Sequence, residues 1–427
     1  MSILVVHVIP DVACTVCGCV CDDLTLHIEE GRVARAERAC ELSEPWLLEQ
    51  DSASDRTPLV AGKHASFESA IATAAKILTA GRAPLLYGLS SSSTAGQRAA
   101  CRLSDLMGAT IDTTASTCHA PSIVALQVVG ESTATLGEIK NRADLILYWG
   151  SNPLKSHPRH VERYVEATGM FVTGGRKDRH LVVVDSKQTA TAEIADRFVK
   201  VDPGKDFELI WAIRTLLQGK TLKESVVAGV TREEIVALTN AMKSCRYGTL
   251  FFGLGLTQHG VTHANVEALI RLVTDLNSHV RFVIRRMRVP GDVAGADSVL
   301  CWQTGFPFSV NLARGYPRYN PGEYTGGRLL EQQEVDAVLF LGTDGIPKLS
   351  DQALRHLETI PAIVVGHSPA EQFSWADVCI PTATYGVHRA GTAYRMDEVP
   401  IPLRRVLESP LPSDAEVLQK IQAMCST

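Results

Sequence analysis

The sequence has no long hydrophobic run and no excess of charge of either sign. Its apolar stretches are strand-sized and far shorter than the roughly 20 residues that a helix needs to cross a bilayer. The 42 basic and 47 acidic residues leave a formal charge of −5, which argues against a protein that coats nucleic acid. With 45% hydrophobic and 21% charged residues, the composition is that of a soluble globular chain. Collagen-like, fibrous and disordered classes are excluded.

The N-terminus lacks the features of a secretory signal. The first residues, MSILVVHVIPDVAC, contain an apolar stretch but neither a basic region before it nor a small-residue cleavage site after it. They indicate a β-strand rather than a signal peptide. We therefore expect a cytoplasmic protein, and its 427 residues imply about two to four compact units.

Cysteine is too sparse, at eleven residues over this length, for a disulfide scaffold. Within the run CTVCGCVC, however, Cys14, Cys17 and Cys21 have the spacing C-x2-C-x3-C, and Cys40 follows after a hairpin-like LTLHIEEGRV. Four thiolates can hold either a tetrahedral zinc or a [4Fe-4S] cluster, and a tight triplet with a distant fourth ligand favours the cluster. We expect Cys19, inside the loop, not to be a ligand.

Most of the remaining cysteines are scattered among apolar neighbours and are expected to be packing residues rather than ligands. We predict that small side chains fill core positions at Cys101, Cys245, Cys301 and Cys379, and that Cys425 is a thiol of the C-terminal tail.

Short apolar runs alternate with amphipathic helical stretches along most of the chain. The runs predicted as strands are 83–89, 144–150, 180–186, 249–256, 281–285, 337–343 and 362–368, and helical stretches include 95–109, 207–219 and 263–277. Continuous apolar strands that alternate with helices are typical of parallel sheets covered on both faces. The predicted fold class is α/β.

Ligands of open parallel sheets bind at the carboxyl ends of the strands. Residues at these positions include Gly150, Ser151, Asn152, Asp185, Ser186, Lys187, Gly253, Gly255, Gly342, Thr343, Asp344, Gly366 and His367. They suit a large polar ligand with phosphates and ribose, because glycines admit close backbone approach and an aspartate accepts from ribose hydroxyls. Taken one loop at a time, simple turns explain them equally well.

Two further segments contain candidate functional side chains. Cys118 follows the apparent strand TIDTTAS and precedes His119, so it is a candidate nucleophile or metal ligand. A buried packing cysteine is the alternative interpretation. The segment SHPRH offers His157, Arg159 and His160, either as contacts to a phosphate or metal or as a solvated basic loop.

Taken together, these motifs carry a family likeness. CTVCGCVCDDL, TASTCHAPS, NRADLILYWGSNPLKSHPRH, LVVVDSKQT, RRMRVPGDVAG and AGTAYRMDEVPI occur in the order in which similar segments occur in the B-type subunit of formylmethanofuran dehydrogenase, a short member of the molybdopterin oxidoreductase superfamily. The resemblance runs nearly from end to end. It implies an iron-sulfur domain at 1–57, a discontinuous α/β domain at 58–119 and 291–427, and a second α/β domain at 120–290.

The resemblance also implies roles for individual residues. Cys14, Cys17, Cys21 and Cys40 match ligands of a [4Fe-4S] cluster, and Cys118 matches the thiolate that binds molybdenum or tungsten. His119 and Arg288 match active-site residues. Positions that resemble parts of the site for two molybdopterin guanine dinucleotides are Gly150, Ser151, Asn152, Asp185 and Gly342.

The function that the resemblance implies is the interconversion of CO2 and formate at a Mo or W bis-pterin centre in one-carbon metabolism such as methanogenesis. It implies partner subunits that process the formyl group. A small β-barrel subunit is expected among them, because the stretch after AGTAYRM is too short for a closed barrel. Two alternatives stay open here: a non-redox scaffold subunit of a bacterial formyltransferase/hydrolase complex, and another superfamily member such as a formate dehydrogenase.

Overall fold

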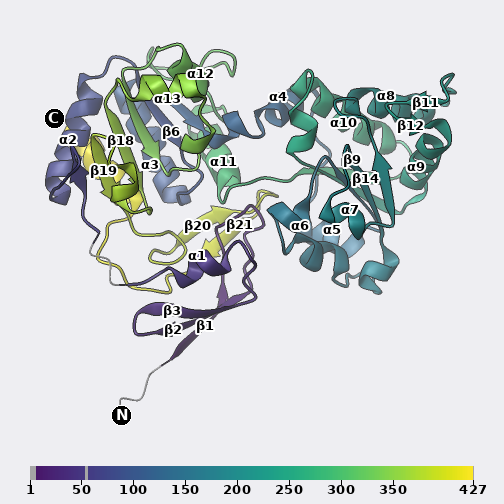
Figure 1. Cartoon of the computed structure of the whole chain (residues 1–427), viewed down its shortest axis with the longest axis horizontal. Coiled ribbons are helices and arrows are strands. Elements are labelled where there is room, and N and C mark those ends of the chain that lie inside the picture. Colours follow the sequence, from purple (N-terminus) through teal and green to yellow (C-terminus); the bar gives the residue numbers. More distant parts are fainter. Residues whose placement is uncertain (1–5, 53–55, 427) are drawn as a thin grey trace. The chain divides into compact units, whose positions relative to one another are not determined.

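The computed structural model describes residues 6–52 and 56–426, and the chain forms two units. Unit 1 combines Met1–Cys118 with Val289–Thr427, and unit 2 is the intervening segment His119–Arg288. Figure 1 shows that each unit is built around a β-sheet with helices on both faces. The chain passes from one unit to the other after Cys118 and returns after Arg288.

The sheet of unit 2 is parallel throughout and has the strand order β10-β9-β8-β13-β14. The strands are β8 (Leu145–Trp149), β9 (His180–Asp185), β10 (Arg197–Lys200), β13 (Tyr247–Phe252) and β14 (Arg281–Arg286). β8 and β13 are buried along their whole length, which is why their sequences are continuous apolar runs. Since β8 comes first in the chain and β13 fourth, the direction of winding reverses between these two neighbours, as in doubly wound sheets.

Helices α8 (Asp206–Leu217), α9 (Arg232–Ser244) and α10 (Thr262–Leu276) contribute to the core of unit 2. Leu147 and Trp149 of β8 share a buried cluster with Ile213 of α8 and Leu269 of α10. Each large apolar side chain buried in this way contributes about 1.5–3 kcal/mol of transfer free energy. The cluster therefore holds the helices firmly on the sheet.

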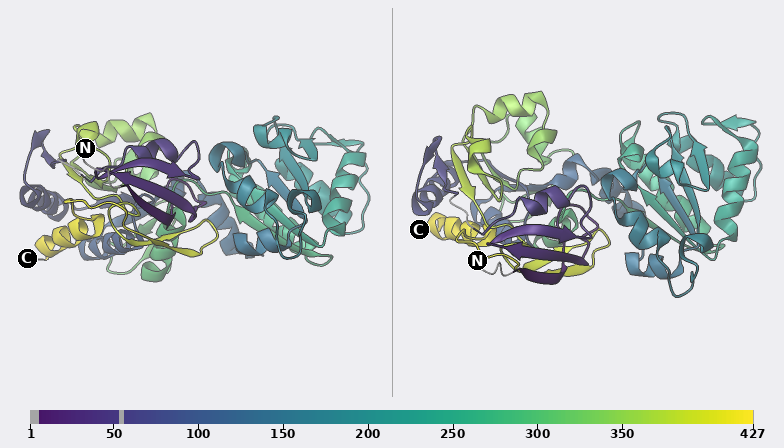
Figure 2. Two further views of the ribbon diagram at one scale, coloured as in Figure 1. Left: turned by 90° about the horizontal axis from the view of Figure 1, so that it is seen from below. Right: turned by 60° about the horizontal axis from the view of Figure 1, so that its bottom comes forward.

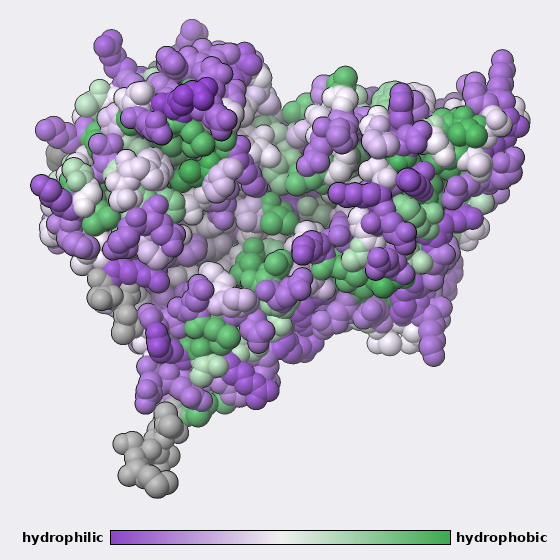
Figure 3. Space-filling view, in the orientation of Figure 1, coloured by the Kyte–Doolittle hydropathy of each residue, from purple (hydrophilic) through white to green (hydrophobic). Residues whose placement is uncertain are grey.

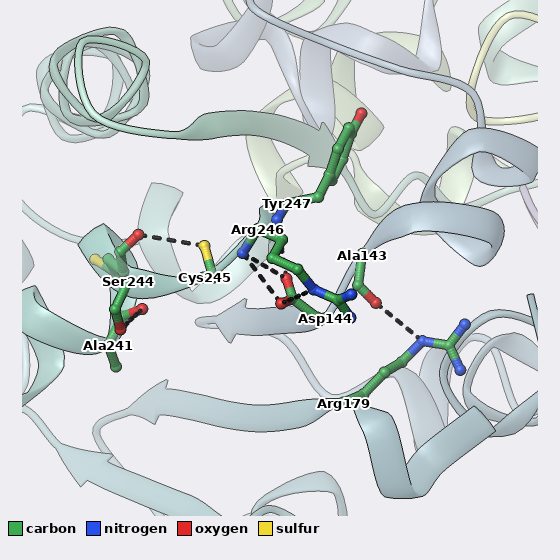
Figure 4. Close-up of polar contacts among 9 residues, drawn as sticks. Ala143, Asp144, Arg179, Ala241, Ser244, Cys245, Arg246 and Tyr247 are labelled. Carbon is green, nitrogen blue, oxygen red and sulfur yellow. Dashed lines mark hydrogen bonds and ion pairs between the residues drawn. The ribbon is translucent and has the colours of Figure 1, made fainter. Parts of the chain in front are cut away.

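Asp144 closes the amino-terminal edge of the unit 2 sheet (Figure 4). Its carboxylate accepts hydrogen bonds from the backbone N–H groups of Arg246 at 3.0 Å and Tyr247 at 2.9 Å, and it pairs with the Arg246 guanidinium. Nearby, Nε of Arg179 donates to the carbonyl of Ala143 at 3.1 Å. These contacts fix the starts of β8, β9 and β13 relative to one another. The carboxyl ends of the same strands are therefore also fixed relative to one another.

The larger sheet of unit 1 has the order β16-β15-β7-β6-β17-β18-β19-β4-β5. Its parallel part consists of β6 (Pro84–Gly88), β7 (Thr110–Thr113), β17 (Ala337–Leu341), β18 (Ala362–Gly366) and β19 (Val378–Pro381). The antiparallel strands at its edges are β15 (Val310–Asn311), β16 (Arg318–Tyr319), β4 (Leu59–Val60) and β5 (Lys63–His64). Its winding reverses between β6 and β17, which gives a second doubly wound arrangement.

Helices cover both faces of this sheet. One buried cluster joins the strands to α2 (Phe67–Ala80), α3 (Thr94–Met107), α11 (Val293–Thr304) and α14 (Asp414–Cys425). A second cluster lies on the other face with α12 (Gly326–Glu331) and α13 (Asp351–Leu357). Residues from both ends of the chain thus build one core, because α14 packs beside α2 and α3 (Figure 1).

A small antiparallel sheet of β1 (His7–Val12), β2 (Leu24–Glu29) and β3 (Arg32–Glu37) carries the cysteine loop. It lies beside the hairpin of β20 (Gly391–Tyr394) and β21 (Pro400–Leu403), as Figures 1 and 2 show. Val20 of the loop packs against Ala393 and Ile401 of the hairpin. The backbone N–H of Met396 donates to the carbonyl of Gly18 at 2.8 Å. The AGTAYRM segment is therefore the support on which the cysteine loop rests.

The α/β class and the parallel sheets predicted from the sequence are confirmed. Each predicted apolar run contains a strand, namely β6, β8, β9, β13, β14, β17 and β18, although the run 249–256 leaves β13 at Phe252 and continues as a 3-10 turn, Leu254–Thr257. The strand expected at the N-terminus runs through His7–Val12, and its first residues lie outside the described part of the chain. One packing prediction is wrong: Cys301 is exposed, since it lies on the outer side of α11, although Cys101 and Cys379 are buried as expected.

Figure 3 shows a face that is largely hydrophilic, with apolar residues in separate small groups. Among the described residues, no helix is both long enough and apolar enough to span a membrane.

Gly248 tests the packing of unit 2. A Cβ at this position of β13 would lie 2.1 Å from Cε2 of the buried Phe282 ring in β14. We expect Gly248→Ala to lower the free energy of unfolding by about 1–3 kcal/mol, because the ring must shift in a filled core. Gly137→Ala in α5 (Leu136–Arg142) is the control, since the nearest atom there is 3.7 Å away. Denaturant unfolding with equal effects in both variants would contradict this steric argument.

Candidate functional site

The carboxyl ends of β8 and β13 approach each other through bare backbone. Gly255 N–H, just after β13, donates to the carbonyl of Gly150 at 3.0 Å, while Gly150 N–H donates to the carbonyl of Val184 in β9 at 2.9 Å. A Cβ on Gly255 would lie 2.8 Å from the carbonyl oxygen of Gly150, and a Cβ on Gly150 would lie 2.8 Å from the backbone N of Leu256. Gly150 also has a φ of +55°. Glycine is thus required where the winding reverses, which is the ligand-binding position of such sheets.

Polar residues flank this crossing. Ser151 is buried next to Gly150, and Oδ1 of Asn152 accepts hydrogen bonds from the N–H of Thr191 at 3.3 Å and from its hydroxyl at 2.7 Å. The Asn152 bonds tie the loop after β8 to α7 (Ala190–Glu193). Asp185, half-buried, ends β9. An acidic side chain at the end of the second strand is where doubly wound proteins bind ribose hydroxyls. The structure therefore brings Gly150, Ser151, Asn152 and Asp185 to one edge.

Unit 1 has a corresponding edge where β6 and β17 end. Ser91, after β6, donates its hydroxyl to the carboxylate of Asp344, after β17. Gly342 has a φ of +76°, and a Cβ on it would lie 3.1 Å from the Cβ of Ser91. Helix α3 begins directly after this loop, with Oγ of Ser93 accepting from the N–H of Gly96 at 3.4 Å. A glycine, a carboxylate and a helix N-terminus thus meet at the reversal point of the second sheet.

The cysteine loop joins β1 to β2 and folds back on itself. The backbone N–H of Cys14 donates to the carbonyl of Cys21 at 2.8 Å. Cys14, Cys17, Cys19 and Cys21 are buried, whereas Cys40 is half-buried. All eleven cysteines of the chain are free thiols, so the loop is not closed by a disulfide.

The predicted cluster ligands are neighbours in space. Burial raises the pKa of the Cys14 thiol, and the nearby Cys17, Cys21 and Cys40 raise it further. Hydrogen bonds with Cys17 and Cys21 raise the pKa of Cys19, so this thiol belongs to the same group. Within the described residues, however, no three His, Cys, Asp or Glu side chains are arranged as a metal site. The loop gathers the thiols without setting the geometry of a ligand shell.

Cys118 lies at the carboxyl end of β7, although the strand is shorter than predicted. β7 ends at Thr113 and continues as a single 3-10 turn, Thr114–Thr117. The turn forms because Oγ1 of Thr113 accepts from the N–H of Ala115 at 3.2 Å. Cys118 follows it, 9% exposed, and its thiol donates to the carbonyl of Val289 at 3.5 Å.

The segment that begins at Val289 connects Cys118 to the cysteine loop. Gly291 N–H donates to the carbonyl of Val16 at 3.4 Å, and Asp292 N–H donates to the carbonyl of Ser90 at 2.9 Å. This stretch therefore contacts Cys118, the cysteine loop and the loop after β6. The sequence motif VPGD alone does not reveal these contacts, because every partner is distant in the chain.

Asp292 is a residue that sequence reasoning missed. Its fully buried carboxylate accepts hydrogen bonds from the N–H of Gly295 at 3.1 Å, the N–H of Tyr394 at 2.6 Å and Nε2 of Gln97 at 3.1 Å. Burial raises its pKa. An aspartate just before a helix predicts an N-cap, but the contacts with β20 and α3 become visible only in the fold.

His119 and Arg288 belong to unit 2. Both are buried: His119 precedes α4 (Ala120–Val129) and Arg288 follows β14. The carbonyl of Arg288 accepts a hydrogen bond from Nε2 of His157 at 2.8 Å. The interpretation of SHPRH as a solvated loop is wrong, because His157, Arg159 and His160 are also buried. The segment turns inward against Tyr148 and Phe251 of the sheet.

Two buried histidines make unit 2 sensitive to acid. Burial lowers the pKa of His157 to about 4, from an ordinary value of 6.5, and lowers that of His160 as well. The unfolded chain therefore binds protons first, so this stabilisation is complete above pH 6.5 and is lost as the pH falls toward 4.

Because of His157, we expect the free energy of unfolding of unit 2 to fall by about 2 kcal/mol when the pH is lowered from 7 to 5. Native-state hydrogen exchange of the β8 and β13 amides, corrected for intrinsic rates, measures this loss. His157→Gln does not titrate and should show a smaller loss over the same interval. An identical pH dependence in the wild type and the variant would contradict a neutral His157 in the folded unit.

Comparison with known proteins gives concordant matches. A family model described as molybdopterin oxidoreductase matches residues 73–411. The chain is 41% identical to the B-type subunit of the tungsten-containing formylmethanofuran dehydrogenase 2 of Methanocaldococcus jannaschii, over 97% of this chain and 98% of that protein. It is 36% identical, with the same coverage of both chains, to the protein of that name from Methanococcus maripaludis.

Among solved structures, the chain resembles the formyltransferase/hydrolase complex of Methylorubrum extorquens, determined with methylofuran. The TM-score is 0.73 at 23% sequence identity, over 87% of this chain and 99% of that one. This likeness concerns the fold alone. On the family model and the two relatives that match nearly the full length, the chain belongs to the molybdopterin oxidoreductase family and, within it, to the B-type subunits of formylmethanofuran dehydrogenases.

Proposed function

We propose that this chain is the catalytic subunit of a tungsten-dependent formylmethanofuran dehydrogenase, which interconverts CO2 and formate. The observation that carries the proposal is the position of Cys118. A thiol at a strand end, in contact through Val289 with the segment that also contacts the cysteine loop, suits a metal ligand next to an electron carrier. Full-length similarity to tungsten-containing relatives supports the same conclusion.

The two reversal points suit the two pterin dinucleotides of such a centre. In unit 2, the glycine crossing of Gly150 and Gly255 carries no side chain that would keep a phosphate away from the backbone, and Asp185 can accept from ribose hydroxyls. In unit 1, Gly342 and the N-terminus of α3 offer similar chemistry. We assign one dinucleotide to each edge. When bound, the pterin dithiolenes and the metal supply the two-electron chemistry of the reaction.

The cysteine loop suits a [4Fe-4S] cluster. Its donors are the soft thiols of Cys14, Cys17, Cys21 and Cys40. The last three lie close enough to Cys14 to raise the pKa of its thiol. Cys40 is the half-buried member. Cys19 lies in the same group, so the choice of ligands among five thiols is itself open to experiment. We assign the cluster to an N-terminal domain, residues 1–57, whose cysteine loop rests on the β20–β21 hairpin.

The chain's own residues then have separate tasks. Cys118 offers the thiolate that binds the metal. The guanidinium of Arg288 can hold the carboxylate of formate through two parallel hydrogen bonds, and the imidazole of His119 can accept or donate the proton that accompanies the reaction.

With a metal held by Cys118 and a cluster held by the cysteine loop, the backbone between Val289 and Asp292 would connect the two sites within unit 1. It contacts Cys118 on one side and Val16 of the cysteine loop on the other. We also propose partner subunits, because the relatives are themselves subunits, and we include among them the small β-barrel subunit that the family likeness implies.

Cys118→Ala tests the metal ligand. We expect the assembled complex of this variant to keep its iron but to lose formate oxidation with an artificial electron acceptor by at least about 1000-fold, since an activated metal site loses its protein ligand. Tungsten and molybdenum are measured by mass spectrometry in the same sample. Cys101→Ala, a buried thiol of α3 outside the site, is the control and should retain activity. Retained activity in Cys118→Ala would refute the assignment.

Cys17→Ala and Cys19→Ala test the cluster. The first should lose iron, because one of four thiolate ligands is missing, whereas the second should keep about four irons per chain. Iron analysis and the low-temperature EPR spectrum of anaerobically purified, reduced complex measure both. Iron loss in Cys19→Ala with retention in Cys17→Ala would reverse the assignment of these two thiols. Zinc in place of iron would refute the cluster.

A further inference from the structure

His157 has a place in unit 2 that the assigned roles leave unexplained. Its imidazole is buried, with 1% of the residue exposed, yet it makes two polar contacts. Nε2 lies 2.8 Å from the carbonyl oxygen of Arg288, and Nδ1 lies 2.8 Å from Oγ of Ser156. The ring therefore joins two segments that are more than a hundred residues apart in the chain.

The direction of both hydrogen bonds follows from chemistry. A carbonyl oxygen only accepts, so Nε2 carries the proton and donates to Arg288. Burial lowers the pKa of the ring, so Nδ1 is bare and accepts from the hydroxyl of Ser156. Because each nitrogen is used, the ring can neither flip nor rotate without losing a contact.

This arrangement connects Arg288 to the ligand edge of the sheet. Ser156 ends α6 (Pro153–Ser156), which begins directly after Asn152. The backbone N–H of Ser156 donates to the carbonyl of Asn152 at 3.1 Å, and Oδ1 of Asn152 accepts from the hydroxyl of Thr191 at 2.7 Å. An unbroken series of hydrogen bonds thus runs from α7 through the loop after β8 to the backbone of Arg288.

The other end of the series is equally constrained. β14 continues past Arg286, because the N–H of Met287 donates to the carbonyl of Phe252 at 2.9 Å. The Arg288 carbonyl is then the last backbone group of unit 2 before the chain returns to unit 1. Without His157 this carbonyl would lose a buried hydrogen bond, and the backbone from which the Arg288 side chain extends would lose one of its constraints.

We propose that His157 is a positioning residue that sets the backbone of Arg288 from the loop after β8. This inference rests on the proposed function, in which Arg288 binds the carboxylate of the substrate. His157 does not touch substrate itself. Its task is to fix the backbone from which the Arg288 guanidinium extends. The loop after β8, which we assign to the cofactor, and Arg288, which we assign to the substrate, are thereby held in a fixed relative position.

The chain supplies a matched control. His160 lies in the same SHPRH segment, is also fully buried, and bonds through Nδ1 to the hydroxyl of Tyr148 at 2.8 Å. Its Nε2 has no hydrogen-bond partner among the described residues. His157→Phe and His160→Phe therefore make the same replacement, an imidazole by a phenyl ring, in the same segment. Only His157→Phe removes the donor to Arg288. In His157→Gln, the side-chain amide occupies nearly the place of Nε2 and can still donate.

The test uses the assembled complex, with metal and iron content measured for each variant. We expect His157→Phe to raise KM for formate by roughly ten- to a hundredfold, because a displacement of about 1 Å in a positioning group has effects of this size. His157→Gln should restore KM to within about threefold of the wild type, and His160→Phe should leave KM unchanged even where it lowers stability. A merely structural role would reduce cofactor content and thermal stability without changing KM of the loaded fraction.

A second measurement keeps this inference separate from the proposed function. Hydrogen exchange of a peptide that spans residues 284–291 should be faster in His157→Phe than in the wild type, and not faster in His160→Phe. If the wild-type complex does not oxidise formate, the proposed function fails, and the exchange data alone decide whether His157 holds Arg288. If KM and exchange in His157→Phe both match the wild type, or if His160→Phe shifts both equally, His157 has no positioning role.

Discussion

Parallel strands that are buried on both faces leave only their ends for chemistry, and the right-handed connections of such a sheet leave a crevice where the winding reverses. This chain meets that constraint twice, between β8 and β13 in unit 2 and between β6 and β17 in unit 1. At each crevice a glycine allows one loop to lie against the next, Gly150 in the first case and Gly342 in the second. The positions of Asp185, Asp344 and Cys118 all follow from being placed directly after a strand or its terminal turn.

Much of this architecture could be predicted because the physical signal is local. A strand with helices on both faces must be apolar at every position, and runs such as LILYW and AVLFL have no other simple explanation. The loop after each run could be predicted to carry function for the same reason. Strand order could not be predicted, because any of these runs pairs equally well with any other. The reversal points, and so the meeting of Gly150 with Gly255, appear only once the order is known.

Polar residues inside the core were harder to predict. SHPRH has the composition of an exposed loop, yet it is buried, and each of its long polar side chains has at least one partner: His157 at Arg288, Arg159 at Glu162, and His160 at Tyr148. Composition describes what a segment would prefer in isolation, whereas burial depends on partners supplied by distant strands. Cys301 shows the converse, since apolar neighbours in the sequence do not prevent one helical position from facing outward. The roles of the thiols stay predictions, because ligand choice depends on geometry that spacing does not determine.

Gly291 explains why the short segment after Arg288 matters more than its length suggests. A Cβ on this residue would lie 2.6 Å from the carbonyl oxygen of Thr15 and 3.1 Å from the hydroxyl of Tyr385, so any other side chain would push the cysteine loop away from it. The adjacent Asp292 holds the segment from the other side through its buried carboxylate. The close packing at Gly291 and the hydrogen bonds of Asp292 together fix the course of the backbone through this segment. That course begins at Arg288, which His157 holds within unit 2, and it passes Cys118 within unit 1. Within unit 1, the segments assigned to the metal and to the cluster therefore contact the same short stretch of backbone.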